Sequence, residues 1–184
     1  MNQKIRLEPG AVLLLGILFF SLRMNQIAAL LAAVILHEAG HLSALWMMGS
    51  PPEGLLFTLS GPVILYQLPN SGWRAAISAL SGPLSGLLLF FLLDHRWQIC
   101  SDMSLILSAV NLLPVLPLDG GRALQAVLNG RIHFLLPVFG FVLPVMIMIL
   151  GLYFISRGQN GSGFLMFGAW LLFLSCQEQQ FDVK

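Results

Sequence analysis

Three polar residues stand close together in an otherwise apolar stretch, in the run His37-Glu38-Ala39-Gly40-His41. Residues four apart share one face of an α-helix, so the imidazoles of His37 and His41 can reach a single metal ion. Glu38 follows the first histidine and can contact a water at the metal without binding the metal itself. Zinc in such a site lowers the pKa of that water to about 7 and polarises a peptide carbonyl, while the glutamate carries a proton to the leaving amine. The pattern therefore indicates metal-assisted hydrolysis of a peptide bond.

A catalytic zinc site needs a third protein ligand and one open position, and Asp119 is the candidate for that ligand. It lies in the run LLPVLPLDGGR, residues 112–122. The two prolines of this run disrupt a helix, and its glycines allow tight turns, so a carboxylate can turn in from a helix end. The alternative is that Asp119 caps a following helix over residues 120–128.

A third candidate group is the amide of Asn111, eight residues before Asp119. An amide in an apolar helix can bind an extended substrate or stabilise an oxyanion, and bridging between helices is the alternative. Between the two motifs lies the run Ser81-Gly82-Pro83-Leu84-Ser85-Gly86. Its small residues are expected to let their helix approach the neighbouring helices closely.

The composition indicates a membrane protein. Of the 184 residues, 57% are apolar and 9% are charged, against about 25% charged residues in a typical soluble domain. The mean hydropathy is +0.85, and so few charged side chains cannot give the chain a water-compatible surface. The net charge of +1 and the lack of a Lys/Arg cluster argue against nucleic acid as a partner.

We therefore expect an all-α polytopic membrane protein that forms a single domain over residues 1–184. A helix needs about 20 residues to cross the hydrocarbon core of a bilayer. The apolar stretches predict six such helices, at about 7–22, 26–48, 74–93, 102–118, 132–156 and 162–177.

The segment between the second and third predicted spans has a different pattern. Two short apolar runs, residues 55–59 and 63–68, are separated by Gly61-Pro62. Each run is too short to span a membrane and a Gly-Pro pair marks a turn, so the segment predicts a hairpin or a re-entrant element. A strand edge here could pair with an extended peptide. The alternative is an interfacial loop that caps the helices.

The basic residues predict the orientation, because Lys and Arg favour the cytoplasmic side of a membrane. Both termini are expected in the cytoplasm, since six basic residues then lie inside and three outside. The inside set is Lys4, Arg6, Arg74, Arg122, Arg131 and Lys184, and the outside set is Arg23, Arg96 and Arg157. The second and fourth spans then end on the same cytoplasmic side, which would bring Asp119 to the depth of the two histidines.

The motifs HEAGH, Ser-Gly-Pro and NLLPVLPLDGGR, in this order, resemble the site-2 proteases, metallopeptidase family M50. The resemblance covers about residues 26–125 and favours a bacterial six-span subgroup that includes a protease releasing a sigma factor during sporulation. It implies one Zn²⁺ per chain on His37, His41 and Asp119, with Glu38 as general base and Asn111 as the polar residue ahead of the Asp motif.

The same resemblance implies partners and a location. The substrate would be a membrane-spanning or membrane-tethered protein, cleaved within or beside its transmembrane segment in the bacterial cytoplasmic membrane. A regulatory membrane protein is a further expected partner, beside the lipid bilayer itself. Two other functions stay open, a metal transporter and an inactive homologue that acts as a membrane chaperone. The ligand set would also accept divalent ions other than zinc.

Overall fold

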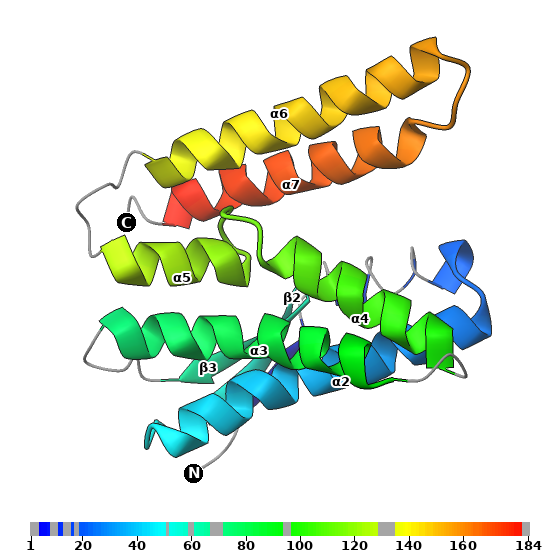
Figure 1. The fold of residues 1–184 in the computed structure, drawn as a ribbon. Helices are drawn as coiled ribbons and strands as arrows, with labels where there is room; N and C mark the ends of the chain where they lie inside the picture. Colours follow the sequence, from blue (N-terminus) through cyan, green and yellow to red (C-terminus); the bar gives the residue numbers. More distant parts are fainter. Residues whose placement is uncertain are drawn as a thin grey trace. The chain divides into compact units, whose positions relative to one another are not determined.

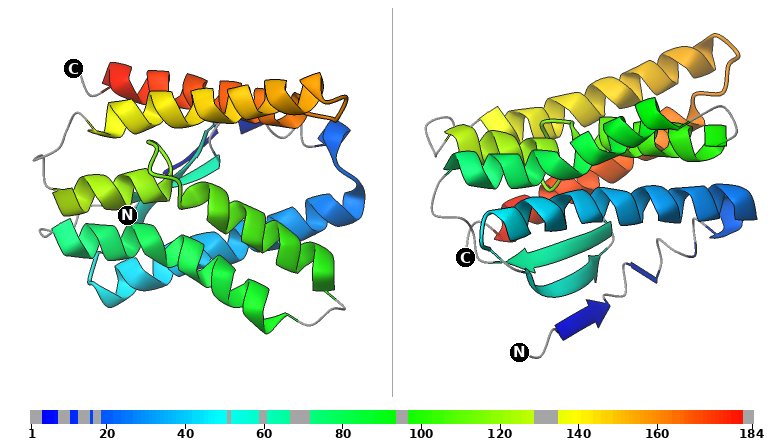
Figure 2. Two further views of the ribbon diagram at one scale, coloured as in Figure 1. Left: turned by 45° about the horizontal axis from the view of Figure 1, so that its top comes forward. Right: turned by 60° about the horizontal axis from the view of Figure 1, so that its bottom comes forward.

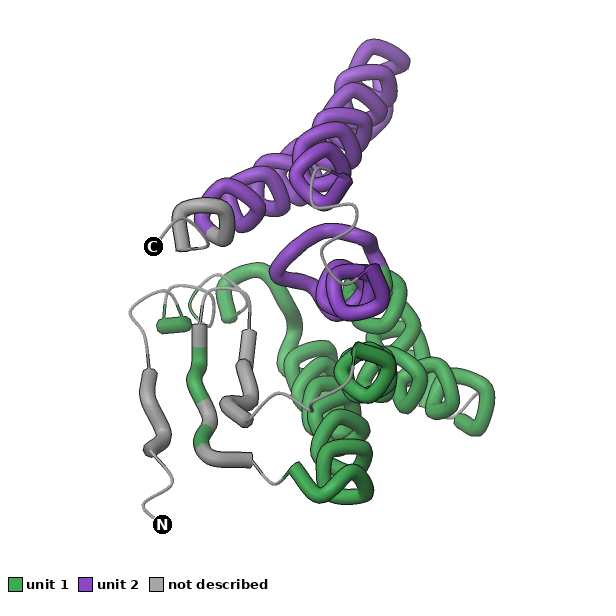
Figure 3. The backbone as a smooth tube through the Cα atoms, turned by 90° about the vertical axis from the view of Figure 1, so that its left-hand side faces the viewer, with its two compact units in different colours: residues 1–112 green, residues 113–184 purple. Residues whose placement is uncertain are grey.

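The structure is a computed structural model with two compact units, residues 1–112 and residues 113–184 (Figure 3). It describes residues 4–7, 11–12, 16, 19–50, 52–58, 61–66, 72–93, 97–128 and 135–181. Among the described residues, the first unit holds helices α2 to α4 and a small sheet, and the second holds helices α5 to α7.

The first unit is built on helices α2 (Met24–Met47), α3 (Gly72–Leu92) and α4 (Gln98–Asn111) (Figure 1). Each of the three packs against the other two. Helices α2 and α3 are long and apolar enough to cross a membrane, as the sequence predicts for the second and third spans. Helix α4 has 14 residues and ends at Asn111, so the prediction of a fourth span reaching residue 118 is wrong.

Two local signals set the ends of α2. At its start the backbone N–H of Arg23 donates to the side chain of Gln26 at 3.0 Å. At its end Gly49 adopts a φ of 72°, a left-handed conformation that glycine adopts without steric cost. This turn lets the N–H of Ser50 bond back to the carbonyl of Leu45 at 3.0 Å, which closes the helix in a Schellman motif.

Small residues line the inner faces of these helices. In α2 the buried positions include Ala29, Ala33 and Ala44, whereas the large Trp46 is 76% exposed. In α4 the buried positions are the serines Ser101, Ser104 and Ser108. Membrane helices associate through small residues because these allow close approach, and large apolar side chains can face lipid. The pattern therefore fits helices that pack inward and meet lipid outward.

The fourth span is cut short by the prolines that follow it. Pro114 has no N–H and its ring clashes with the preceding turn of a helix. The chain instead makes two tight turns, in which the N–H of Val115 donates to Leu113 at 2.8 Å and that of Leu118 donates to Val115 at 2.9 Å. Both Val115 and Leu118 are buried, so the turns are packed in place. A new helix then begins at Asp119.

A three-stranded sheet corrects the all-α expectation. Strand β1 (Lys4–Leu7) pairs in parallel with β2 (Pro52–Thr58), which pairs antiparallel with β3 (Gly61–Tyr66). The hairpin of β2 and β3, which follows directly after α2 and is seen from two sides in Figure 2, confirms the hairpin prediction. The pair Gly61-Pro62 opens β3 instead of forming the turn, which fits an outer strand because proline lacks a ladder donor.

The first predicted span is shortened by the same sheet. Its expected start at residue 7 belongs to β1, and the positions described between residues 11 and 21 are helical. The rest of this predicted span lies outside the described residues.

The second unit contains α5 (Asp119–Leu128), α6 (Leu135–Ser156) and α7 (Ser162–Phe181). Helices α6 and α7 pack side by side as a hairpin (Figure 1). Helix α6 is long and apolar enough to cross a membrane, and residues Ser162–Gln177 form a shorter apolar helix. Both match the last two predicted spans. Three candidate membrane-spanning helices are thus found in the described part of the chain.

Candidate metal centre

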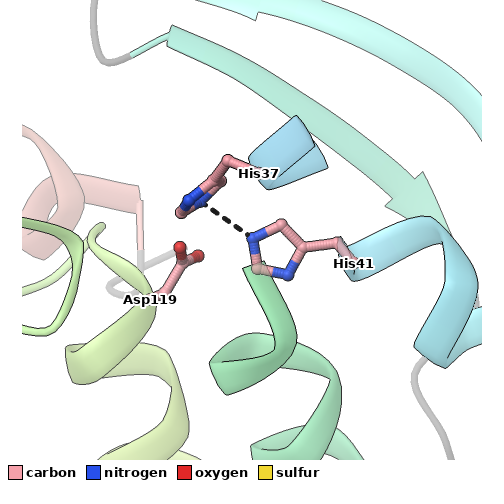
Figure 4. Close-up of side chains that lie close together, drawn as sticks. All are labelled: His37, His41 and Asp119. Atoms are coloured by element: carbon pink, nitrogen blue, oxygen red, sulfur yellow. Dashed lines mark hydrogen bonds between the residues drawn. The ribbon is translucent and has the colours of Figure 1, made fainter. Parts of the chain in front are cut away.

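Helix α2 brings the two motif histidines into contact. The Nε2 atoms of His37 and His41 lie 3.2 Å apart, and their ring planes are inclined at 75° (Figure 4). The side chain of His37 is 4% exposed. The sequence predicted that the two imidazoles share a helix face, and the structure confirms it.

The outer nitrogen of His41 is fixed by helix α3. His41 Nδ1 lies 2.7 Å from the backbone carbonyl oxygen of Ser78. A carbonyl can only accept, so Nδ1 carries the hydrogen and donates it. A neutral imidazole with its hydrogen on Nδ1 has a lone pair on Nε2, the arrangement that a metal-binding histidine needs.

The spacing of the two Nε2 atoms fits one zinc ion. Zinc–nitrogen bonds of 2.0–2.1 Å in a tetrahedral site place the two nitrogens about 3.3–3.4 Å apart. The separation of 3.2 Å in this chain lies close to that value. With the hydrogen of His41 on Nδ1, its Nε2 accepts a hydrogen bond from Nε2–H of His37 (Figure 4). Loss of that one hydrogen would leave two nitrogens at a spacing that suits a metal ion of zinc's size.

The other predicted site residues lie on three elements. Glu38 follows His37 in α2 and is half-buried. Asp119 is the first residue of α5 in the second unit, also half-buried. The acid is thus the first residue inside α5, one position after the N-cap that the capping alternative expects. His37, His41 and Asp119 are the three described residues of the candidate metal group, each offering one ligand atom (Figure 4).

The turn before Asp119 is tightly built. A Cβ atom on Gly121 would lie 2.6 Å from the carbonyl oxygen of Val115, so only glycine lets α5 start this close to the preceding turn. The first helical bond of α5 runs from the N–H of Arg122 to the carbonyl of Leu118 at 3.0 Å. These contacts lie within the second unit and fix the backbone around the acid.

Asn111 ends helix α4 and is half-buried. Its side-chain NH₂ donates to the carbonyl of Leu107 at 3.0 Å, one turn back in the same helix. A substrate or helix-bridging role for this amide stays a prediction.

Sequence reasoning missed the part that α3 takes in the site. The Ser-Gly-Pro patch was expected only to allow close packing, yet its Gly82 lies against the His41 ring. One turn before it, the backbone carbonyl of Ser78 bonds to His41. The role of α3 could have been found from a glycine followed by a proline inside a long apolar helix. Both residues destabilise a helix interior, so their presence there indicates a close contact that needs them.

The arrangement of these helices and strands matches a fold that is already known. The solved site-2 protease from Methanocaldococcus jannaschii has a similar fold, with a TM-score of 0.68 over 97% of this chain and 91% of that chain, at 22% sequence identity. This likeness shows that the chain has the site-2 protease fold.

Curated relatives point the same way. A protein of Synechocystis sp. named as a zinc metalloprotease (sll0528) is 31% identical over 120 residues, 56% of this chain and 32% of that protein. Stage IV sporulation protein FB of Bacillus subtilis is 24% identical over 143 residues, 71% of this chain and 50% of that protein. No family model matches the chain.

The chain spans between about a third and a half of the length of these two relatives. The matches confirm the resemblance to the site-2 protease family that the motifs indicated. Together with the three candidate membrane-spanning helices, they identify the chain as an integral membrane protein.

Proposed function

We propose that the chain is an intramembrane zinc metalloprotease that hydrolyses a peptide bond within or near a transmembrane segment of a membrane-tethered protein. The observation that carries this proposal is the converging pair of Nε2 atoms, 3.2 Å apart, with the tautomer of His41 set by Ser78. The names of the similar proteins support it, because zinc metalloproteases and a site-2 protease are among them.

The proposed ligand set is His37, His41 and Asp119, which leaves one position open as catalytic zinc sites require. Zinc held there would polarise the scissile carbonyl and acidify a water molecule. Glu38 lies beside the first ligand in α2, where its carboxylate can take the proton of that water and later give it to the leaving amine. In this proposal Asn111, at the end of α4, contacts the extended substrate or its developing oxyanion.

The sheet offers a place for an extended substrate. Strand β3 is an outer strand in the order β1-β2-β3, and an outer strand carries backbone donors and acceptors that a peptide can join. A peptide held in this way has left its helical conformation, which is the state in which its carbonyl is accessible. We propose β3 as the docking strand for the substrate segment.

The topology belongs to the same proposal. We propose six spans within one membrane-embedded domain over residues 1–184, with a catalytic core at about 26–125. The excess of basic residues in the expected inner segments supports cytoplasmic termini and an active site toward the cytoplasm. The substrate and a regulatory membrane protein are the proposed partners.

Glu38→Gln gives the decisive test, because it removes the base and keeps the proposed ligands. Wild type and variant are purified in detergent, and bound zinc and cleavage of a panel of single-span substrates are measured. We expect about one zinc per chain in both proteins and a loss of cleavage of about 10²–10⁴-fold in the variant. A well-folded wild type without zinc, or equal cleavage by both proteins, would contradict the mechanism. A transporter or a binding protein would keep its function in the variant.

A further inference from the structure

The imidazole of His41 rests on Gly82 of helix α3. A Cβ atom placed on Gly82 would overlap the Nε2 atom of His41 and would lie 2.6 Å from both Cδ2 and Cε1 of the same ring. Because the two ring carbons are equally distant and Nε2 is nearer, the Cβ position lies over the ring plane at its Nε2 edge. Any side chain at position 82 would therefore displace the nitrogen that faces His37.

The ring has little freedom to yield, because its other nitrogen is held. His41 Nδ1 donates to the carbonyl of Ser78 at 2.7 Å, and Ser78 lies one helical turn before Gly82. The same carbonyl accepts the hydroxyl of Ser81 at 2.6 Å. One turn of α3 thus supplies both the hydrogen-bond acceptor and the open surface for the imidazole.

The two helices also touch directly at this level. A Cβ atom on Gly40 would lie 2.6 Å from the carbonyl oxygen of Ser81 and 2.6 Å from Oγ of Ser85. The hydroxyl of Ser85 donates to the carbonyl of Leu36 at 3.0 Å, directly before His37 in the sequence. Helix α3 therefore contacts α2 alongside both histidines.

We propose that Gly82 is a positioning residue of the metal centre. Its missing side chain, together with the Ser78 carbonyl, holds the His41 ring with Nε2 directed at His37. This inference rests on the proposed function, because it assigns Gly82 a role toward the metal that the two histidines would bind.

Gly86, one turn further along α3, provides a matched control. A Cβ atom there would overlap the hydroxyl of Ser108 in α4, and a serine hydroxyl can rotate away about its side-chain bond. The next nearest atom is the carbonyl oxygen of Ser104 at 3.4 Å, so an alanine fits after that rotation. Both substitutions add one methyl group to the same buried face, and only one of them meets the histidine.

The test is a Co²⁺ titration of the full chain in detergent, for wild type, Gly82→Ala and Gly86→Ala. The visible absorption of bound Co²⁺ reports affinity and ligand geometry, and competition with Zn²⁺ gives the zinc affinity. Substitution of groups that orient a metal ligand weakens metal binding by about 10–100-fold. We expect that loss and an altered Co²⁺ spectrum for Gly82→Ala, and the wild-type affinity and spectrum for Gly86→Ala. Thermal unfolding of the metal-free proteins is recorded in parallel.

Wild-type metal affinity in Gly82→Ala would overturn the inference while leaving the proposed function intact. A wild type that binds neither ion would overturn the proposed function, and this inference with it. If Gly82→Ala fails to fold, nitrogen NMR of the histidine-labelled, metal-free wild type decides, with the His41 signal assigned by its loss from a His41→Gln sample. A hydrogen on Nδ1 of His41 is the expected result, and a hydrogen on Nε2 would overturn the inference.

Discussion

Two helix pairs of this chain, α6 with α7 and α2 with α3, approach closely at glycines, and the two contacts have different roles. Between α6 and α7, a Cβ atom on Gly168 would meet the side chain of Met148 at 2.6 Å and the carbonyl oxygen of Pro144 at 2.8 Å. Between α2 and α3, a Cβ atom on Gly82 would meet the ring of His41. The first contact lets two helices pack, and the second makes room for an imidazole of the candidate metal group.

The hydrogen bonds of the two helix pairs also differ, because those cited for α2 and α3 join the two helices. In α7 the hydroxyl of Ser175 donates to Leu171 of its own helix at 2.9 Å. Between α2 and α3, the bonds of His41 to Ser78 and of Ser85 to Leu36 cross from one helix to the other. Bonds between helices fix rotation and register, which bonds within one helix cannot do. A small-residue pattern alone therefore does not tell a packing contact from a positioning contact, and the partner atoms do.

The largest effect on metal binding is expected for His41→Gln. This substitution removes the ring that distinguishes the contact at Gly82 from the packing contact at Gly168. Loss of a direct ligand should weaken zinc binding by more than the roughly 100-fold upper value for groups that only orient ligands, and proteolysis should disappear. The zinc content after dialysis measures the loss of binding, and His133→Gln is the control because His133 lies outside the motif. Full zinc occupancy in His41→Gln would exclude His41 as a ligand.

The α6–α7 contact should respond in stability and not in metal binding. Gly168→Ala adds a methyl group against Met148 and Pro144, and overpacking of this kind typically costs about 1–3 kcal/mol. Gly163→Ala in the same helix is the matched control, because a Cβ atom there has nothing within 4 Å. Thermal unfolding should show a lower Tm for Gly168→Ala alone, with equal Co²⁺ affinity in both. A changed metal affinity in Gly168→Ala would contradict the assignment of a packing role to the α6–α7 contact.

The smallest effect is expected for Ser85→Ala, which removes a hydroxyl that bonds to Leu36 of α2 at 3.0 Å and to Gly82 of its own helix at 2.7 Å. Hydrogen bonds between membrane helices contribute about 0.6 kcal/mol on average, so stability should fall slightly and metal affinity by a small factor. Ser156→Ala removes a hydroxyl that bonds to Tyr153 of its own helix at 2.7 Å, with no bond to another helix among the described residues. Unfolding and Co²⁺ titration of the two variants would sharpen the comparison. Identical behaviour of both would show that the Ser85 bond does not matter.

The sequence was most informative where the pattern is local. The spacing of His37 and His41 is a property of any α-helix, so their shared face could be predicted without a structure. The prolines at 114 and 117 predicted a break before Asp119, although not that it begins right after Asn111. The hairpin followed from two short apolar runs.

Contacts between distant segments were less accessible. Strand β1 has only four residues, and its pairing with β2 joins parts of the chain about 50 residues apart, which no short pattern reveals. The bond from His41 to a backbone carbonyl of Ser78 is equally hidden, because a carbonyl is present at every residue. Side-chain identity and spacing nominate candidate ligands, whereas the backbone groups that orient them are found only in the coordinates.

The short helix α4 has a consequence for how water reaches the site. Its 14 residues extend about 21 Å at 1.5 Å per residue, against a hydrocarbon core of about 30 Å. The turns over residues 112–118 that follow it leave the regular helix, and irregular backbone at membrane depth is tolerated only inside protein or beside water. If α4 enters the membrane at its first residue, its end at Asn111 lies within the hydrocarbon core, and the segment that leads to Asp119 then needs protein or water around it.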